Sequence, residues 1–266
     1  MFLLELFVFA ILGVIIGSFA NVVILRAPKS LSIGGRSRCP SCVHILSPLD
    51  LIPVLSFILL RGRCRYCQAS ISYQYAIVEL VTGLAYAWIF WTLLPSDLLG
   101  FLFLCKYLVV VTVAIIVFVV DFKHFLILDA VLLPAVLIVL GQNVLLDITG
   151  QRLGLLSGYT LSGFLGAISA TIAFYGIWFL SGGKWMGFGD VKFVGFMGMV
   201  LGFPLIWLAV LLAFMMGGLV AVPLLLFANK NLQSRVPFGT FLSVALVVVT
   251  LYGQAILSWY LGLLGL

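Results

Sequence analysis

Long runs of apolar residues, interrupted by short polar segments, occupy most of the chain. A run of about 20 apolar residues can cross a bilayer as a helix, whereas strands of a membrane barrel would alternate apolar and polar residues. The pattern therefore predicts an all-α, polytopic integral membrane protein with about eight transmembrane helices. We place them at residues 2–25, 76–94, 99–120, 126–146, 157–180, 191–204, 206–228 and 238–262, the sixth being the shortest.

Composition supports this fold class. The chain is 64% hydrophobic and 8% charged, with a mean hydropathy of +1.32, whereas a soluble domain carries about 25% charged residues. A water-soluble fold is therefore excluded. The first apolar run continues to Leu25 and lacks a basic start, so we expect a retained first span rather than a cleaved signal peptide.

Residues 26–75 form the one sizeable polar segment. It contains a shorter apolar stretch, Leu49 to Leu60, which is broken by Pro53 and too short to span; an interfacial or re-entrant helix is expected there. We divide the chain accordingly into residues 1–75, the first helix plus this loop, and residues 76–266, a transmembrane bundle.

The cations predict the orientation of the spans. Arginine and lysine gather in cytoplasmic loops of membrane proteins. Eight spans with the polar segment in the cytoplasm place twelve of the fourteen cations on that side, leaving Lys106 and Arg152 on or towards the other. The cytoplasmic twelve are Arg26, Lys29, Arg36, Arg38, Arg61, Arg63, Arg65, Lys123, Lys184, Lys192, Lys230 and Arg235.

The positive charge does not indicate nucleic-acid binding, because the basic residues lack interleaved aromatic or strand platforms. Arg61, Arg63 and Arg65 either hold anionic headgroups of membrane lipid or simply retain the loop in the cytoplasm.

Two CxxC pairs lie in the polar segment, Cys39–Cys42 and Cys64–Cys67, separated by 21 residues. Two such pairs can supply four thiolates to one tetrahedral Zn²⁺. Two disulfides or free thiols are the alternatives, and a reducing cytoplasmic loop disfavours disulfides. A four-cysteine site leaves no open coordination position, so the predicted zinc is structural.

Two of the eight carboxylates stand at the ends of apolar runs. Asp121 follows Val109 to Val120, and Asp190 ends the tetrad Gly187-Phe188-Gly189-Asp190. Ionisable groups at such positions are costly and point to function. Each could instead cap a helix or pair with a neighbouring lysine, Lys123 or Lys192. The predicted topology places both aspartates at the cytoplasmic boundary, where one ionised and one protonated carboxyl could catalyse peptide hydrolysis.

Three residues could support such a pair. Gly187 and Gly189 permit close approach of backbone or substrate. Asp129 either caps the following span or assists the two aspartates.

Several segments together resemble the bacterial type IV prepilin peptidases, or leader peptidases. They run nearly end to end: Gly17-Ser18-Phe19-Ala20-Asn21 through Arg26-Ala27-Pro28, Asp50-Leu51-Ile52-Pro53, Leu60-Arg61-Gly62-Arg63-Cys64, Ile71-Ser72-Tyr73-Gln74-Tyr75 with Glu79-Leu80, and Pro237-Phe238-Gly239. The chain departs from the family at Ala76, Leu128 and Thr240, where the family frequently has proline.

The resemblance implies that Asp121 and Asp190 are the catalytic aspartates and that the four cysteines bind zinc. It implies removal of the basic leader from type IV prepilins or type II secretion pseudopilins at the cytoplasmic face of the bacterial inner membrane. It also implies N-methylation of the new terminus with S-adenosylmethionine. Glu79 either lies near the sulfonium of that methyl donor or is a solvated helix-end residue. The sequence does not indicate an oligomeric state.

Helix ends suggest roles for the two aspartates. Asp190 lies near the start of a predicted span, where the positive helix end favours an anion, and Asp121 lies at the end of one. The sequence therefore predicts Asp190 as the base and Asp121 as the protonated acid.

Two other function classes compete. A transporter or channel would use membrane carboxylates to bind cations or relay protons, although the two related halves typical of many transporters are not found. A non-catalytic, zinc-bearing assembly factor is the other.

Overall fold

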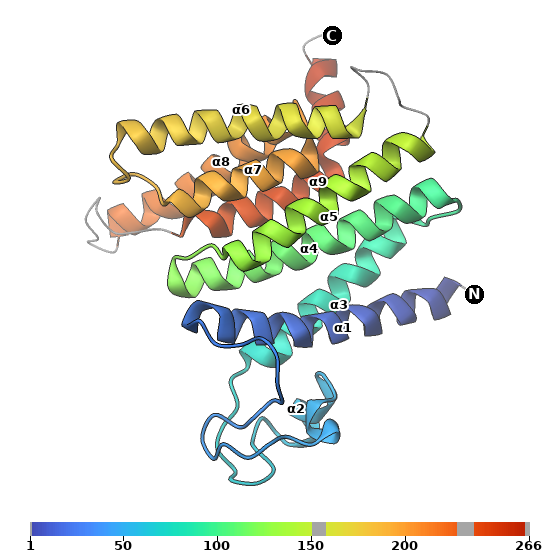
Figure 1. The fold of residues 1–266 in the computed structure, drawn as a ribbon, viewed down its shortest axis with the longest axis vertical. Coiled ribbons are helices and arrows are strands. Elements are labelled where there is room, and N and C mark those ends of the chain that lie inside the picture. The colour runs from blue at the N-terminus through green and yellow to red at the C-terminus, as the bar shows by residue number, and fades with distance from the viewer. Residues whose placement is uncertain (1, 151–157, 228–236, 264–266) are drawn as a thin grey trace. The chain divides into compact units, whose positions relative to one another are not determined.

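The computed structural model describes residues 2–150, 158–227 and 237–263, with only the backbone described for residues 222–227. The secondary-structure elements within those ranges are helices, apart from two isolated β-bridges (Figure 1). The helices are α1 (Phe2–Arg26), α2 (Leu55–Leu59), α3 (Gln74–Leu93), α4 (Leu98–His124), α5 (Asp129–Thr149), α6 (Tyr159–Leu180), α7 (Phe188–Leu201), α8 (Leu205–Phe227) and α9 (Phe238–Leu263), with 3₁₀ turns η1 (Ala27–Lys29) and η2 (Pro48–Leu51).

The predicted fold class is confirmed. A helix forms at each of the eight predicted spans, and six of them are long and apolar enough to cross a membrane, within the described ranges. The exceptions are α8, whose described side chains give a shorter apolar stretch, and α7. The 14 residues of α7 rise about 21 Å at 1.5 Å each, less than the roughly 30 Å hydrocarbon core. Arg152, Lys230 and Arg235, used in the orientation argument, lie outside the described residues.

Two compact units make up the chain, Met1–Leu94 and Pro95–Leu266. The first unit includes α3 because this helix packs along α1. Glycines permit this approach: a Cβ at Gly13 would lie 2.6 Å from the carbonyl oxygen of Thr82, and one at Gly17 2.8 Å from Cα of Glu79. Close packing through small residues is typical of membrane helices.

The polar loop leaves and re-enters this helix pair at one place. The Asn21 side chain on α1 donates a hydrogen bond to the carbonyl of Tyr75 at 3.0 Å, although 54 positions separate them. The apolar stretch predicted as one interfacial or re-entrant helix forms η2 and the five-residue α2. Leu55, Ile58 and Leu59 of α2 are exposed.

In the second unit, α6 packs closely on α7, and α9 packs on α4 and α8. Glycines of α6 make the contact with α7: Cβ atoms added at Gly163 and Gly166 would lie 2.9 Å from the carbonyl oxygen of Met199 and 2.8 Å from that of Gly198. Phe174, Phe193 and Phe196 are fully buried in the core. This packing fixes α7 firmly against its neighbours.

Candidate active site and metal site

Asp121 lies in the last turn of α4, and its side chain meets the start of α9. The residue is buried, with 5% of its surface exposed. Its Oδ2 accepts a hydrogen bond from the backbone N–H of Thr240 at 2.9 Å. A Cβ at Gly239 would lie 2.9 Å from the same oxygen, so this approach requires glycine.

Asp190 is the third residue of α7. Its Oδ2 accepts a hydrogen bond from the backbone N–H of Gly187 at 3.2 Å, which satisfies one of the N–H groups left unpaired at a helix start. Gly189 faces the turn between α4 and α5, where an added Cβ would lie 3.0 Å from Cβ of Ile127. The tetrad therefore places a carboxylate at a helix N-terminus and lets that helix approach its neighbour.

Ile127 connects the surroundings of the two aspartates. Its Cδ1 would lie 3.2 Å from a Cβ at Gly239, beside Asp121, and its Cβ faces Gly189, beside Asp190. The charges of Asp121 and Asp190 interact electrostatically. The structure thus brings two aspartates that are 69 positions apart to one end of the second unit.

The Asp129 carboxylate pairs with Lys192, whose Nζ lies 2.7 Å from Asp129 Oδ2. Lysine 192 therefore does not serve as the partner that one alternative assigned to Asp190. Both side chains of the pair are partly exposed. Asp129 is also not a cap, because α5 begins at this residue and the N-cap position is Leu128. The pair links the start of α5 to the start of α7.

From the sequence, Asp121 lies only at the end of a helix, where an anion is disfavoured. The structure adds the start of α9, whose positive end and Thr240 N–H favour an anion at Asp121. Asp121 therefore lies between the negative end of α4 and the positive end of α9, so these helix ends act on it in opposite directions, and we compare the hydrogen bonds of the two aspartates instead.

The four predicted cysteines converge. Their Sγ atoms all lie within 4.8 Å of one another, with Cys39 and Cys64 buried and Cys42 and Cys67 exposed. The Sγ atoms of Cys39 and Cys67 are 3.8 Å apart. A tetrahedral Zn²⁺ with Zn–S bonds of about 2.3 Å requires S···S separations of about 3.8 Å. The donor set and spacing can therefore hold a metal ion.

The two CxxC segments form the same turn. In each, the first cysteine exchanges backbone hydrogen bonds with the residues four and five positions later: Cys39 with Val43 and His44, and Cys64 with Gln68 and Ala69. Val43 and Gln68 have positive φ angles of 60° and 58°. Two copies of one turn thus present four sulfurs to one point.

The thiols are also tuned for metal binding. Hydrogen bonds from the backbone N–H groups of Cys42 and Ser41 lower the pKa of Cys39 to about 6. At Cys67 the Ala69 N–H lowers the pKa, but desolvation and hydrogen bonds with the other thiols raise it to about 11. One thiolate beside three thiols resists further ionisation, so a full set of thiolates needs a cation.

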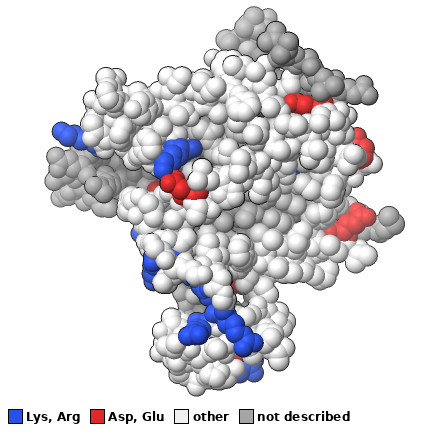
Figure 2. All heavy atoms as spheres, viewed as in Figure 1, with Lys and Arg blue, Asp and Glu red and all other residues white. Residues whose placement is uncertain are grey.

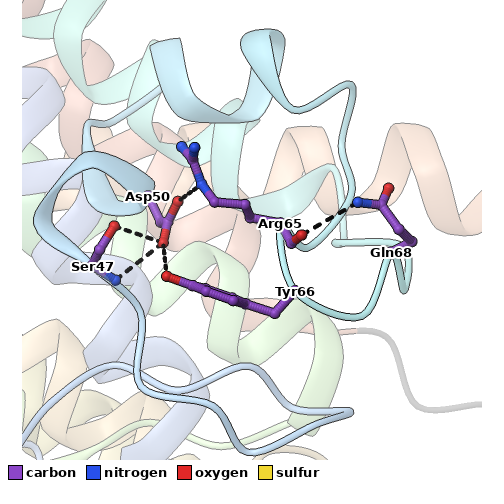
Figure 3. Close-up of polar contacts among 5 residues, drawn as sticks. All are labelled: Ser47, Asp50, Arg65, Tyr66 and Gln68. Carbon is purple, nitrogen blue, oxygen red and sulfur yellow. Dashed lines mark hydrogen bonds and ion pairs between the residues drawn. The ribbon is translucent and has the colours of Figure 1, made fainter.

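A polar network around Asp50 joins the two halves of the loop (Figure 3). Its carboxylate accepts from the Ser47 hydroxyl at 2.8 Å and from Arg65 Nε at 2.6 Å, and from the Tyr66 hydroxyl at 3.2 Å. Burial alone would raise the pKa of Asp50, but hydrogen bonds from Ser47 and Arg65 lower it to about 2. No charge or spacing pattern in the sequence singles out Asp50 as the centre of this network.

Glu79 is not the solvated helix-end residue that one alternative assumed. It is buried, and its Oε2 accepts a hydrogen bond from the backbone N–H of Val54 at 2.7 Å. Val54 has a positive φ of 60°, which is rare for a β-branched residue. Glu79 thus holds the middle of the loop's apolar stretch, between η2 and α2, against α3.

Basic side chains gather on the loop that contains α2 (Figure 2). Arg65 is engaged with Asp50, and Arg26 donates to carbonyls of residues 32–34 and 36. These two cations therefore stabilise the loop itself.

Comparison with known proteins identifies the chain. Residues 11–93 match the Bacterial Peptidase A24 N-terminal domain, and residues 108–222 match the Type IV leader peptidase family. A Prepilin leader peptidase/N-methyltransferase of Aeromonas salmonicida is 32% identical, covering 94% of this chain and 91% of the relative. The chain belongs to the type IV leader peptidase family. The resemblance inferred from sequence motifs is confirmed.

Other members of the leader peptidase family are similarly related. Proteins with the same name from Bacillus subtilis and Pseudomonas aeruginosa are 30% and 27% identical; they cover 94% and 96% of this chain and are themselves covered to 96% and 93%. No solved structure matches the chain. Membership makes this a multi-pass membrane peptidase with N-methyltransferase relatives, and neither the transporter nor the assembly-factor hypothesis is needed.

Proposed function

We propose that the chain removes the basic leader from type IV prepilins or type II secretion pseudopilins, with Asp121 and Asp190 as the catalytic pair. The proposal adds the N-methylation of the new terminus with S-adenosylmethionine. It places the catalytic end of the second unit at the cytoplasmic face of the inner membrane. The observation that carries it is the approach of two buried aspartates, each at a glycine-bordered helix N-terminus.

In this mechanism one carboxylate is ionised and the other protonated. The ionised carboxylate takes a proton from water, and the hydroxide adds to the scissile carbonyl carbon while the protonated carboxyl donates a hydrogen bond to the carbonyl oxygen. The C–N bond then breaks, and the departing nitrogen receives the proton. The pair returns to its starting state with one proton shared between them.

We assign the base to Asp121, which reverses the expectation from the sequence. The Thr240 N–H lies 2.9 Å from Asp121 Oδ2, whereas the Gly187 N–H lies 3.2 Å from Asp190 Oδ2. A shorter hydrogen bond to the charged form favours ionisation. The anion at Asp121 then opposes a second charge on Asp190, which keeps the proton on Asp190.

Cys39, Cys42, Cys64 and Cys67 would hold a Zn²⁺ ion, which would cross-link the loop without an open position for chemistry. Glu79 would contribute to the methyl-donor site from its position against the loop. We expect Glu79→Gln to weaken S-adenosylmethionine binding, measured by calorimetry, with leader cleavage retained. Wild-type affinity in this variant would remove Glu79 from the donor site.

The decisive test is cleavage of a prepilin in membranes by Asp121→Asn and Asp190→Asn. Each should fold as the wild type does and lose leader cleavage. Asp129→Asn is the matched control, because its carboxylate lies at the same end but pairs with Lys192. Full cleavage by either of the first two variants would refute the catalytic pair.

A further inference from the structure

Three polar side chains are buried in the second unit at a distance from the catalytic aspartates. Lys106 on α4 and Asn143 and Asp147 on α5 have 4%, 0% and 9% of their surface exposed. A lysine within an apolar span is costly to bury and indicates a specific role. None of the three enters the peptidase mechanism above.

Hydrogen bonds connect this cluster to α7. The Lys106 Nζ donates to Asn143 Oδ1 at 2.7 Å, and Asn143 Nδ2 donates to the backbone carbonyl of Met199 at 2.9 Å. One amide group on α5 therefore bridges a side chain of α4 and the backbone of α7.

Met199 needs this donor because α7 ends early. The last carbonyls of a helix have no intrahelical partner. The N–H that would continue the helix to Met199 belongs to Phe203, and it donates instead to the Ser162 carbonyl at 3.1 Å. Asn143 supplies the missing donor, and the Lys106 cation lies near the negative end of α7, where a cation is favoured.

Asp147 completes the cluster from the next turn of α5. Its two oxygens accept the backbone N–H groups of Tyr159 at 2.6 Å and Thr160 at 2.9 Å, which caps the start of α6. Its charge also interacts with that of Lys106. The cluster thus gives the buried cation a counter-charge and joins α4, α5, α6 and α7.

We propose that Lys106 and Asn143 are positioning residues that fix the axial register of α4 against α7, and with it the separation of the Asp121 and Asp190 carboxylates. Lys106 shares α4 with Asp121, about 22 Å along the helix, and Met199 shares α7 with Asp190, about 13 Å along it. α5 and α9 each pack against both helices. The inference rests on the proposed catalytic pair.

Variants of the full-length enzyme separate the two hydrogen bonds. Asn143→Leu removes both bonds, whereas Asn143→Asp keeps an acceptor for Lys106 but has no donor for Met199. Gly163→Ala should displace both atoms of the Asn143–Met199 hydrogen bond from the α6 side, because its Cβ would lie 2.9 Å from the Met199 oxygen and 3.1 Å from Asn143 Nδ2. Thr250→Val is the matched control, since its hydroxyl donates within α9 to the Leu246 carbonyl.

Two measurements are made on each variant. The first is kcat and KM for a prepilin peptide across pH. The second is the distance between spin labels attached to non-natural residues at positions 124 and 192, on α4 and α7, which leaves the native cysteines intact. We expect the three variants to lower kcat about 10-fold or more with KM within about twofold, since misplacement by about 1 Å can cost up to 100-fold. Their label distance and pH profile should shift, and those of Thr250→Val should not.

Wild-type kcat, pH profile and label distance in folded Asn143→Asp and Gly163→Ala would overturn the proposal, whether or not Asn143→Leu folds. The label distance does not depend on which residues are catalytic. Activity retained by Asp121→Asn would therefore refute the proposed function, while the label distance would still test whether Lys106 and Asn143 fix the register of α4 against α7.

Discussion

Replacing Thr240 with proline should remove one hydrogen-bond donor from Asp121 and leave the neighbouring side chains in place. Thr240 is the third residue of α9, where the backbone N–H has no intrahelical partner and proline is tolerated. Helix α9 should therefore form. The leader peptidase family frequently has proline at this position. Threonine in its place gives this chain a backbone N–H that donates to Asp121 at 2.9 Å.

The expected effect can be calculated. A hydrogen bond to a charged group contributes about 1.5–3 kcal/mol, and about 1.4 kcal/mol corresponds to one pH unit. The bond stabilises the ionised carboxylate, so its loss means that a higher pH is needed to ionise Asp121. If Asp121 is the base, the acid limb of the kcat/KM profile should move up by about 1 to 2 pH units.

The assay is cleavage of a prepilin peptide from about pH 4 to pH 9, a range that contains both limbs of a bell-shaped profile. Thr240→Val is the control, because it keeps the N–H and loses only the hydroxyl bond to the Pro237 carbonyl. The ionisable groups nearby, Asp190, the Asp129–Lys192 pair, Lys123 and His124, are the same in both variants. An unchanged acid limb, or movement of the alkaline limb alone, would refute Asp121 as the base.

Three further predictions follow from the loop and the surface ion pair. Cys39→Ser should lower bound zinc, measured by elemental analysis, and impair methylation before cleavage, whereas Cys105→Ser should retain the metal; equal zinc in both would contradict the four-cysteine site. Asp50→Asn should destabilise the loop at neutral pH by about 1 kcal/mol, because Arg65 is half exposed and its ion pair is screened. Because the folded pKa of Asp50 is depressed to about 2, the contribution is present above about pH 4 and is lost as the pH falls towards 2, so hydrogen exchange of the loop in the two proteins should converge in acid. Lys192→Ala should change the melting temperature and cleavage little, since exposed ion pairs contribute about 0–1 kcal/mol; a large loss of cleavage would give this pair a role in the chemistry.

The features that follow from local sequence were predicted well. Apolar runs determine the helices because each must satisfy its own backbone inside the membrane. The spacing of the CxxC pairs predicted a cluster because each pair needs only one tight turn, and the structure contains that turn twice. The position of Asp190 at a helix start was readable from its place before an apolar run.

The features that depend on packing between distant segments could not be predicted. The donor to Asp121 is a backbone N–H from α9, and the residue type at that position does not predict this contact. The hydrogen bond from Val54 to Glu79 is a tertiary contact, so the sequence left Glu79 either near the methyl donor or solvated at a helix end. The Lys106–Asn143 bond likewise requires the register of α4 and α5. A lysine within an apolar run is the one signal of this contact in the sequence.

The hydrogen bond between Asn21 and Tyr75 shows that the two ends of the cysteine loop lie next to each other, so the loop is an insertion between two paired helices. A segment of this kind can be excised or exchanged without stretching the scaffold, because α1 and α3 already lie together through Gly13 and Gly17. A short turn joining the two helices would give a hairpin that lacks all four clustered cysteines. The same junction offers a place to graft a foreign domain, so that the loop can be gained, lost or replaced as a cassette while the helices beneath it remain paired.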